Sequence, residues 1–234
     1  MLGYIIFDLD GTLIDSMKQH QEIFGKMLYE GFGISQERGE NIYIETAGKP
    51  LDEQFQIVLQ QSGIRGENIT RLVDEFWSRV KTIRFSPFKD VPLAIRALHN
   101  AGYSLFVTSG STNAIVEAKL SHAGITDCFQ LVLGSGYSAT SDKKGADHFR
   151  KIQKQLKLET DAFRQSTMFV GDGKHDMQLA KEEGFVGVLR TGKRATMDIE
   201  ADFYINDLTD LINRLKRENS HTDIFMRIAE LRHT

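Results

Sequence analysis

The chain has 234 residues, of which 41% are hydrophobic and 26% charged, so it is long enough to bury a core and fits an ordinary globular protein. Its formal net charge of −3 disfavours a nucleic-acid binder, which usually carries a basic face. The sequence has no run of about 18 apolar residues and no basic signal-peptide start, and its single cysteine, Cys128, has no internal disulfide partner. We therefore expect a cytoplasmic protein whose partners are neither membranes nor nucleic acids.

The first stretch, Tyr4 to Phe7, is β-branched and aromatic and predicts a buried strand. It runs into Asp8 and Asp10, followed by Gly11. Side chains two apart on a strand share a face, so these carboxylates project together, or fan around one point if the chain turns at the glycine. Two carboxylates with no adjacent cation repel each other, which favours a metal ion or a shared proton between them. Oxygen ligands in a mostly hydrated site suit Mg²⁺.

Residues 16–86 predict a small helical domain inserted after this strand. Its clearest helix runs from Glu67 to Arg84, where apolar residues at helical spacing form one stripe. Weaker helices are predicted at Met17–Glu30 and Leu51–Gln61, the latter with Pro50 in its first turn.

Beyond Pro87, helices alternate with strands, which predicts βαβ units and a parallel sheet. The predicted strands are Tyr103–Val107, Gln130–Leu133, Thr167–Val170, Phe185–Leu189 and Phe203–Ile205. The predicted helices are 92–100, one ending near Ala123, Ala146–Leu156, His175–Glu183 and Asp207–Arg217.

The expected fold is α/β, with a Rossmann-like parallel-sheet core formed by residues 1–15 and 87–218. Residues 16–86 form the inserted helical cap. Residues 219–234 are either a loosely held tail or a short helix over Asp223–Leu231.

Polar clusters follow several of the predicted strands, at the edge where a parallel sheet places its site. The clusters are Asp8 with Asp10, Thr108 with Ser109, Lys143 with Lys144, and Asp172 with Asp176. Together they supply carboxylates for a metal, hydroxyls for hydrogen bonds and a fixed cation. This set of groups suits phosphoryl transfer, in which catalysis is mostly positioning and charge neutralisation.

The pattern resembles the haloacid dehalogenase-like hydrolase superfamily over residues 4 to about 190. The four matching motifs are Asp8-Leu9-Asp10-Gly11-Thr12, then Thr108, then Lys143, then Gly171-Asp172-Gly173-Lys174-His175-Asp176. The helical insert resembles the cap of the branch that holds phosphoglycolate phosphatases and β-phosphoglucomutases.

The resemblance implies a role for each acidic residue. Asp8 corresponds to the nucleophile that forms an aspartyl-phosphate, and Asp10 to the general acid/base. Mg²⁺ would be held by Asp8, by the backbone carbonyl of Asp10 and by Asp172, with Asp176 in a supporting position.

The resemblance also assigns the phosphate-binding residues. Thr108, Ser109 and Gly110 would bind the phosphoryl oxygens, and Lys143 would pair with the phosphate and with Asp8. In this branch the lysine motif usually reads Lys-Pro-x-Pro-Asp. Here residues 143–147 lack both prolines, so Lys144 is the alternative to Lys143. Lys49 lies in the corresponding cap loop and is expected to contact the part of the substrate that is not transferred.

These features predict a Mg²⁺-dependent phosphatase that acts on a small phosphorylated metabolite, as a monomer or a weak homodimer. A phosphomutase of the β-phosphoglucomutase type is the alternative, because it needs the same Asp8 and Asp10. A dehalogenase is disfavoured, since that branch lacks the second aspartate. More remote alternatives are a phospho-receiver module, usually about half this length, and a binding protein that has lost catalysis.

Overall fold

The computed structural model describes residues 3–47, 49–136, 141–192 and 198–219. Six parallel strands form one sheet in the order β3-β2-β1-β4-β5-β6. The strands are β1 (Tyr4–Asp8), β2 (Ser104–Ser109), β3 (Phe129–Gly134), β4 (Thr167–Gly171), β5 (Val186–Arg190) and β6 (Phe203–Ile205). The predicted parallel α/β sheet is therefore confirmed. The predicted helix over Asp223–Leu231 lies outside the described residues.

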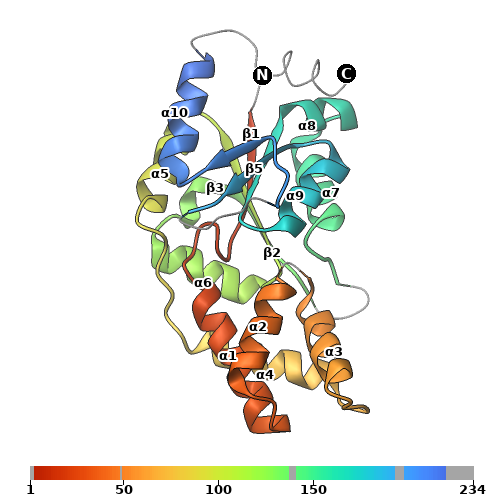
Figure 1. The fold of residues 1–234 in the computed structure, drawn as a ribbon. Helices are drawn as coiled ribbons and strands as arrows, with labels where there is room; N and C mark the ends of the chain where they lie inside the picture. The colour runs from red at the N-terminus through yellow and green to blue at the C-terminus, as the bar shows by residue number, and fades with distance from the viewer. Residues whose placement is uncertain (1–2, 48, 137–140, 193–197, 220–234) are drawn as a thin grey trace.

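Helices lie on both faces of this sheet and beyond one of its ends (Figure 1). The helices that follow β1 are α1 (Met17–Phe32), α2 (Gln36–Glu45), α3 (Leu51–Gln61) and α4 (Ile69–Lys81). The others are α5 (Val91–Asn100), α6 (Asn113–Ala123), α7 (Ala146–Leu156), α8 (Thr160–Ser166), α9 (Lys174–Glu183) and α10 (Leu208–Asn219), with a 3-10 turn at Thr126–Cys128. None of the helices in the described ranges is both long and apolar enough to cross a membrane.

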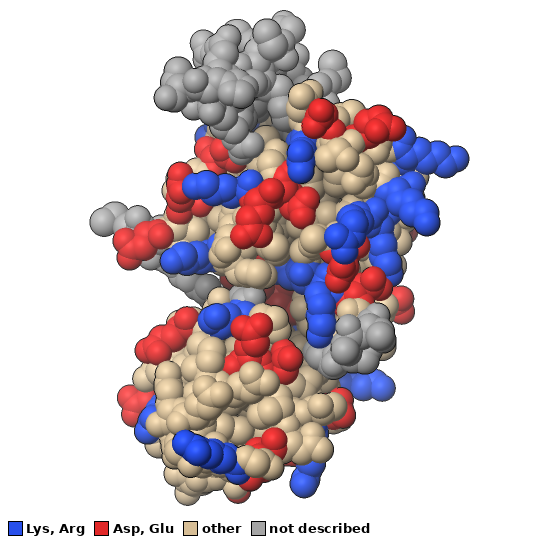
Figure 2. Space-filling model, turned by 90° about the vertical axis from the view of Figure 1, so that its right-hand side faces the viewer, with Lys and Arg blue, Asp and Glu red and all other residues tan. Residues whose placement is uncertain are grey.

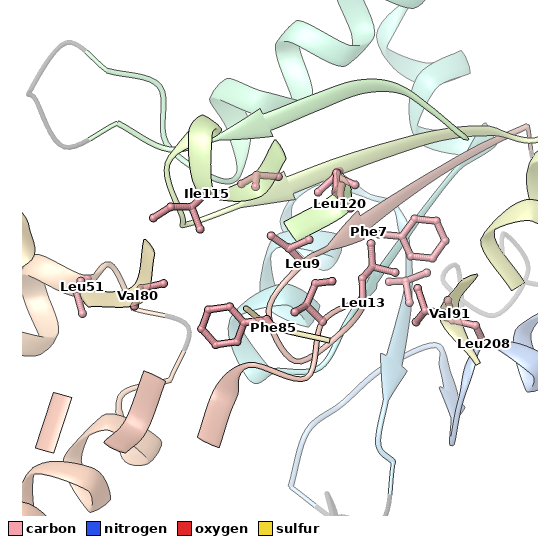
Figure 3. Packing of buried hydrophobic residues seen from close by; sticks show 14 of the residues in the cluster. Phe7, Leu9, Leu13, Leu51, Val80, Phe85, Val91, Ile115, Leu120 and Leu208 are labelled. Atoms are coloured by element: carbon pink, nitrogen blue, oxygen red, sulfur yellow. The ribbon is translucent and has the colours of Figure 1, made fainter. Parts of the chain in front are cut away.

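The side chains of β1 alternate between the two layers of helices that cover the sheet. Ile5 and Phe7 belong to a buried cluster that includes residues of α5, α6 and α10 (Figure 3). Ile6 packs on the other face with residues of α7, α8 and α9. Because both faces are covered, β1 is apolar throughout until it reaches Asp8, as expected for a central parallel strand.

Helices α1–α4 form the insert after β1 and lie beyond the carboxyl ends of the strands (Figure 1). Its interior is aromatic: the Phe24 ring lies 4.6 Å from that of Phe55 and 5.3 Å from that of Tyr43. Helix α2, which the sequence analysis did not single out, packs on α1 through two glycines. A Cβ on Gly39 would lie 2.8 Å from the Gly25 Cα, so a side chain at this position would force the two helices apart. The exact domain boundaries stay a prediction.

A partly buried ion pair connects three elements of the core. Arg190, at the end of β5, donates two hydrogen bonds of 2.9 and 2.7 Å to the Asp90 carboxylate at the start of α5. The same carboxylate accepts the Leu208 backbone N–H at the start of α10, 2.9 Å away. Burial raises the pKa of Asp90, but its bonds to Arg190 and Leu208 outweigh burial, and the pKa lies below the usual value.

We expect Asp90→Asn to lower the free energy of unfolding at pH 7 by about 2–3 kcal/mol, the scale of hydrogen bonds to charged groups. A carboxyl with a depressed folded pKa stabilises the protein above its unfolded pKa, and this contribution is lost as pH falls through the folded pKa. The difference between the two proteins should therefore shrink as pH falls below about 4. Urea unfolding of both proteins at several pH values measures this difference in the free energy of unfolding. Asp161→Asn, in an exposed pair, is the control and should cost less than about 0.5 kcal/mol.

Candidate active site

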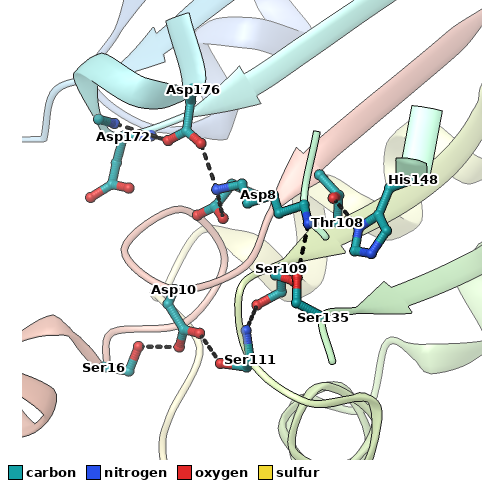
Figure 4. A network of polar contacts seen from close by, with 12 residues as sticks. Asp8, Asp10, Ser16, Thr108, Ser109, Ser111, Ser135, His148, Asp172 and Asp176 are labelled. Carbon is teal, nitrogen blue, oxygen red and sulfur yellow. Dashed lines mark hydrogen bonds and ion pairs between the residues drawn. The ribbon is translucent and has the colours of Figure 1, made fainter. Parts of the chain in front are cut away.

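The carboxyl ends of β1 and β4 bring three aspartates together. Asp8 ends β1, Asp172 follows β4, and Asp176 lies in the first turn of α9. One carboxylate oxygen from each lies within 4.8 Å of the others (Figure 4). Three hard oxygen ligands at this spacing fit a divalent cation such as Mg²⁺.

Two glycines make this approach possible. Gly11 has a φ of +90°, and a Cβ there would lie 2.2 Å from the Asp172 Oδ2 atom. A Cβ on Gly171 would lie 2.6 Å from the Asp176 Oδ2 atom. A larger residue at either position would push an aspartate away from Asp8, so the glycines are part of the site.

A lysine neutralises part of the negative charge of the three aspartates. The Lys144 Nζ atom lies 2.6 Å from Asp8 Oδ1 and 2.6 Å from Asp176 Oδ1. Burial raises the pKa of Asp8 to about 7, and the Asp176 charge adds to the rise, while the Lys144 ammonium opposes it. The same two carboxylates raise the pKa of Lys144 against the effect of burial, so the lysine stays charged.

This contact corrects the prediction that Lys143 pairs with Asp8. The loop before α7 is anchored by its backbone: the Lys143 N–H donates to Asp147 Oδ2 and the Lys144 N–H to Ser135 Oγ. These bonds hold the loop, which lacks the two prolines, in the conformation that lets Lys144 reach Asp8. Lys143 lines the same cavity, which also contains Ser135.

Asp10 turns away from the three aspartates. Its carboxylate accepts hydrogen bonds from Ser16 Oγ and Ser111 Oγ (Figure 4). It also contacts the Lys119 ammonium. Burial raises the pKa of Asp10, but the Lys119 charge outweighs it, and the pKa lies well below the usual range. Asp10 is therefore ionised at neutral pH in this arrangement.

A buried histidine from the insert completes the surroundings of Asp10. His20 of α1 has its Nε2 atom 3.2 Å from Lys119 Nζ and 4.0 Å from Asp10 Oδ1. Burial lowers the pKa of His20 to about 3, so the ring is neutral and accepts from the lysine. The rings of Phe76, Trp77 and Phe85 surround it at 5.3–5.9 Å.

The structure also corrects the prediction for Thr108. Strand β2 extends through Ser109, two residues further than predicted, so Thr108 is still in the strand beside Asp8. Its side chain is fully buried, and Oγ1 lies 2.6 Å from His148 Nδ1 of α7 (Figure 4). Ser109 and Gly110, which were predicted together with Thr108, do line the cavity.

The site opens into a cavity of about 450 Å³ between the insert and the core. Asp8, Asp10, Lys144 and Asp172 line its core side. Lys49 lines the other side, where its half-exposed Nζ lies 3.8 Å from Glu53 Oε2. Figure 2 shows the two lobes with positive and negative side chains intermixed over the visible face.

The sequence analysis missed Lys119, His20 and the serines around Asp10. One signal was available for Lys119. It occupies a position among the apolar residues Ile115, Val116 and Leu120 of α6, and a lysine on a buried helical face requires a charged partner. Ser111 carried no such signal, because its partner Asp10 is distant in the sequence.

Comparisons with known proteins agree with this geometry. The model of the haloacid dehalogenase-like hydrolase family matches residues 5–188. The phosphoglycolate phosphatase of Rhodobacter capsulatus is 27% identical over 207 residues, covering 84% of this chain and 88% of the relative. The probable phosphatase IndB of Dickeya dadantii is 28% identical over 193 residues, 80% of each chain. The structure of a predicted phosphatase from Clostridium acetobutylicum superposes with a TM-score of 0.76 at 20% identity, covering 93% of this chain and all of that one.

We expect Mg²⁺ to raise the midpoint of thermal unfolding, and EDTA to reverse the rise. A ligand at 100 times its Kd that binds only the folded state adds about 2.7 kcal/mol of stability. Asp172→Asn removes a carboxylate from the metal group and should abolish most of the shift. Asp52→Asn changes a cavity carboxylate outside that group and should keep it. An undiminished shift in Asp172→Asn would show that the ion binds elsewhere.

Proposed function

Because the chain belongs to the haloacid dehalogenase-like hydrolase family, we propose that it is a Mg²⁺-dependent phosphatase of small phosphorylated metabolites that acts through an aspartyl-phosphate on Asp8. The observation that carries the proposal is the setting of Asp8. It lies at the end of the central strand, between Lys144 and two further aspartates, and faces a cavity large enough for an organic substrate. A monomer or weak homodimer in the cytoplasm stays a prediction.

Asp8 is the proposed nucleophile. Its carboxylate oxygen forms the new bond to phosphorus as the bond to the leaving oxygen breaks, and the electron pair of that bond goes to the leaving oxygen. Attack requires the ionised carboxylate, which the Lys144 ammonium favours. Mg²⁺, held by Asp8, Asp172 and the backbone carbonyl of Asp10, would supply positive charge next to the phosphoryl oxygens.

Asp176 supports these groups in two ways. Its Oδ2 atom accepts the backbone N–H groups of Asp172 and Gly173, at 3.2 and 3.1 Å, which fixes the turn that presents Asp172. Its Oδ1 atom holds Lys144 in place. We propose that Ser109 and Gly110, at the end of β2, bind the phosphoryl oxygens from the opposite side of the cavity.

Asp10 is the proposed general acid/base. In the first step it gives a proton to the leaving oxygen, and in the second it takes one from the water that attacks the aspartyl-phosphate. The second step restores the proton used in the first, so the two balance over a cycle. The ionised state that Lys119 favours is the base form that the second step needs. The first step needs the protonated form, which the Lys119 charge opposes, so Asp10 has to take up its proton before the leaving oxygen departs.

The pocket lysine on the insert has a separate proposed role. Lys49 is half-exposed on the wall opposite Asp8, and its pair with Glu53 is a surface pair of small energy. It is therefore available to contact a polar group on the part of the substrate that is not transferred.

The proposal is tested by assaying phosphate release from a panel of phosphorylated metabolites, with Mg²⁺ and with EDTA. We expect turnover with Mg²⁺ only. Asp8→Asn should lower it by at least several orders of magnitude, because a neutral amide does not attack phosphorus, while its circular dichroism spectrum stays native. Asp161→Asn, which changes an exposed carboxylate that does not line the cavity, serves as the control and should keep its turnover. Near-normal turnover in Asp8→Asn under saturating Mg²⁺ would contradict the nucleophile assignment, and isomerised product in place of free phosphate would indicate a mutase.

Two adjacent lysines offer a matched pair of variants. Lys144→Met should lower kcat by about 10²-fold or more, on the scale of losing one group that stabilises developing charge. Lys143→Met, whose ammonium has no contact with Asp8 in the structure, should stay within about fivefold of the wild type. Both are measured on the best substrate of the panel, with thermal unfolding as the check on folding. The reverse order of effects would restore the assignment of Lys143.

A further inference from the structure

The insert presents an apolar wall to the cavity, facing the acidic core side. Each of its four helices contributes to this wall. The apolar side chains concerned are Met17 of α1, Tyr43 and Ile44 of α2, Leu51 of α3, and Phe76 and Trp77 of α4. A wall of this kind recognises apolar surface, because hydrocarbon and aromatic groups gain free energy when they leave water.

Ile44 shows that part of this wall is open to a ligand. It lies in the last turn of α2, and the residue is 55% exposed. Among the described residues, it shares this degree of exposure with only three other large hydrophobic residues: Tyr29, Leu93 and Tyr204. Of these four, Ile44 alone lines the cavity. The exposed isoleucine thus marks apolar surface that a bound substrate would cover.

The charges on the same wall disfavour a second anionic group. Within the described residues, the charged groups that the insert places on the cavity are Glu45, Lys49 and Asp52. The one lysine among them, Lys49, also has the Glu53 carboxylate 3.8 Å from its ammonium, which adds a further negative charge beside this wall. Lys143 and Lys174 line the same cavity from the core, so the position that disfavours a carboxylate or second phosphate is the insert wall beside Glu45 and Asp52, where the net charge is negative.

The size of the cavity also bears on the leaving group. Its volume of about 450 Å³ falls in the range of roughly 300–1,000 Å³ that is typical of pockets for drug-sized ligands. A phosphoryl group bound at Asp8 occupies only the core end. The remaining space, next to Ile44 and Trp77, accommodates an organic group of several carbon atoms.

We infer that the substrate is a phosphate monoester whose leaving group has an uncharged, largely apolar body, alkyl or aromatic, that packs against Met17, Ile44 and Trp77. The inference rests on the proposed phosphatase function and names its substrate class. It separates this chain from the relative whose name specifies phosphoglycolate, a small ester with a carboxylate in its leaving group. Polar groups of the leaving alcohol lie toward Lys49.

The experiment compares methyl, butyl and hexyl phosphate with 2-phosphoglycolate, using kcat/KM for phosphate release with Mg²⁺. Primary alkyl leaving groups have similar basicity, so differences along the series report contacts with the wall and not the chemical step. Each buried methylene is worth about fourfold at most. We expect kcat/KM to rise at least about tenfold from methyl to hexyl phosphate, and butyl phosphate to exceed 2-phosphoglycolate.

A matched pair of variants locates the contact. Ile44→Asp should lower kcat/KM for hexyl phosphate at least about fivefold through KM, and leave methyl phosphate within about twofold. Leu93→Asp, an exposed leucine of α5 away from the cavity, should change neither. Three outcomes would overturn the inference and leave the phosphatase function standing. They are a kcat/KM that does not change from methyl to hexyl phosphate, a higher kcat/KM for 2-phosphoglycolate than for butyl phosphate, and equal losses for both alkyl esters in Ile44→Asp. If the folded protein releases phosphate from no ester, the proposed function fails, and the inference fails with it.

Discussion

The contact of Lys144 with both Asp8 and Asp176 is the interaction on which the rest of the site depends. Two carboxylates about 4 Å apart repel by about 4 kcal/mol at an effective dielectric constant of 20, and three of them meet at the end of β1. Burial adds a desolvation cost to each ionised group. One ammonium shared by two carboxylates offsets part of this repulsion. The charge that remains is negative, which is why this end of the sheet is suited to a divalent cation.

The elements around the site can be understood as supports for that contact. Lys144 reaches Asp8 because Asp147 and Ser135 accept hydrogen bonds from the backbone N–H groups of Lys143 and Lys144. Asp172 and Asp176 reach Asp8 because Gly11 and Gly171 leave room for them. The parallel sheet aligns the ends of β1, β2 and β4, so side chains that lie far apart in the sequence meet at one edge.

Much of the fold was predictable because it follows from local patterns. Several features depend only on residues that are close together in the sequence. They are the apolar strands, the apolar stripe on α4, and the glycines that end α1, α6 and α9. The lysine prediction was wrong by one position, and the phosphate-binding prediction included Thr108, which is buried in the strand, because strand ends and loop conformations depend on partners elsewhere in the sequence. Thr108 stays in β2 since it pairs with Asp8, and Lys144 is oriented through Ser135. Helix α2 was missed since only a few of its residues face the interior.

The two reactive carboxylates receive their cations from opposite faces of the sheet. Lys144 precedes α7, which covers one face, whereas Lys119 comes from α6, which covers the other. Asp8 and Asp10 are only two residues apart, and each contacts its own lysine, while the charge of Asp10 still raises the pKa of Asp8. The environment of Asp10 also includes His20 and Ser16, at the start of the insert. A displacement of α1 relative to the core changes the distance from His20 to Lys119, and with it the field at Asp10. The position of the insert and the acid/base group are thus physically coupled, whereas the set around Asp8 consists of core residues alone.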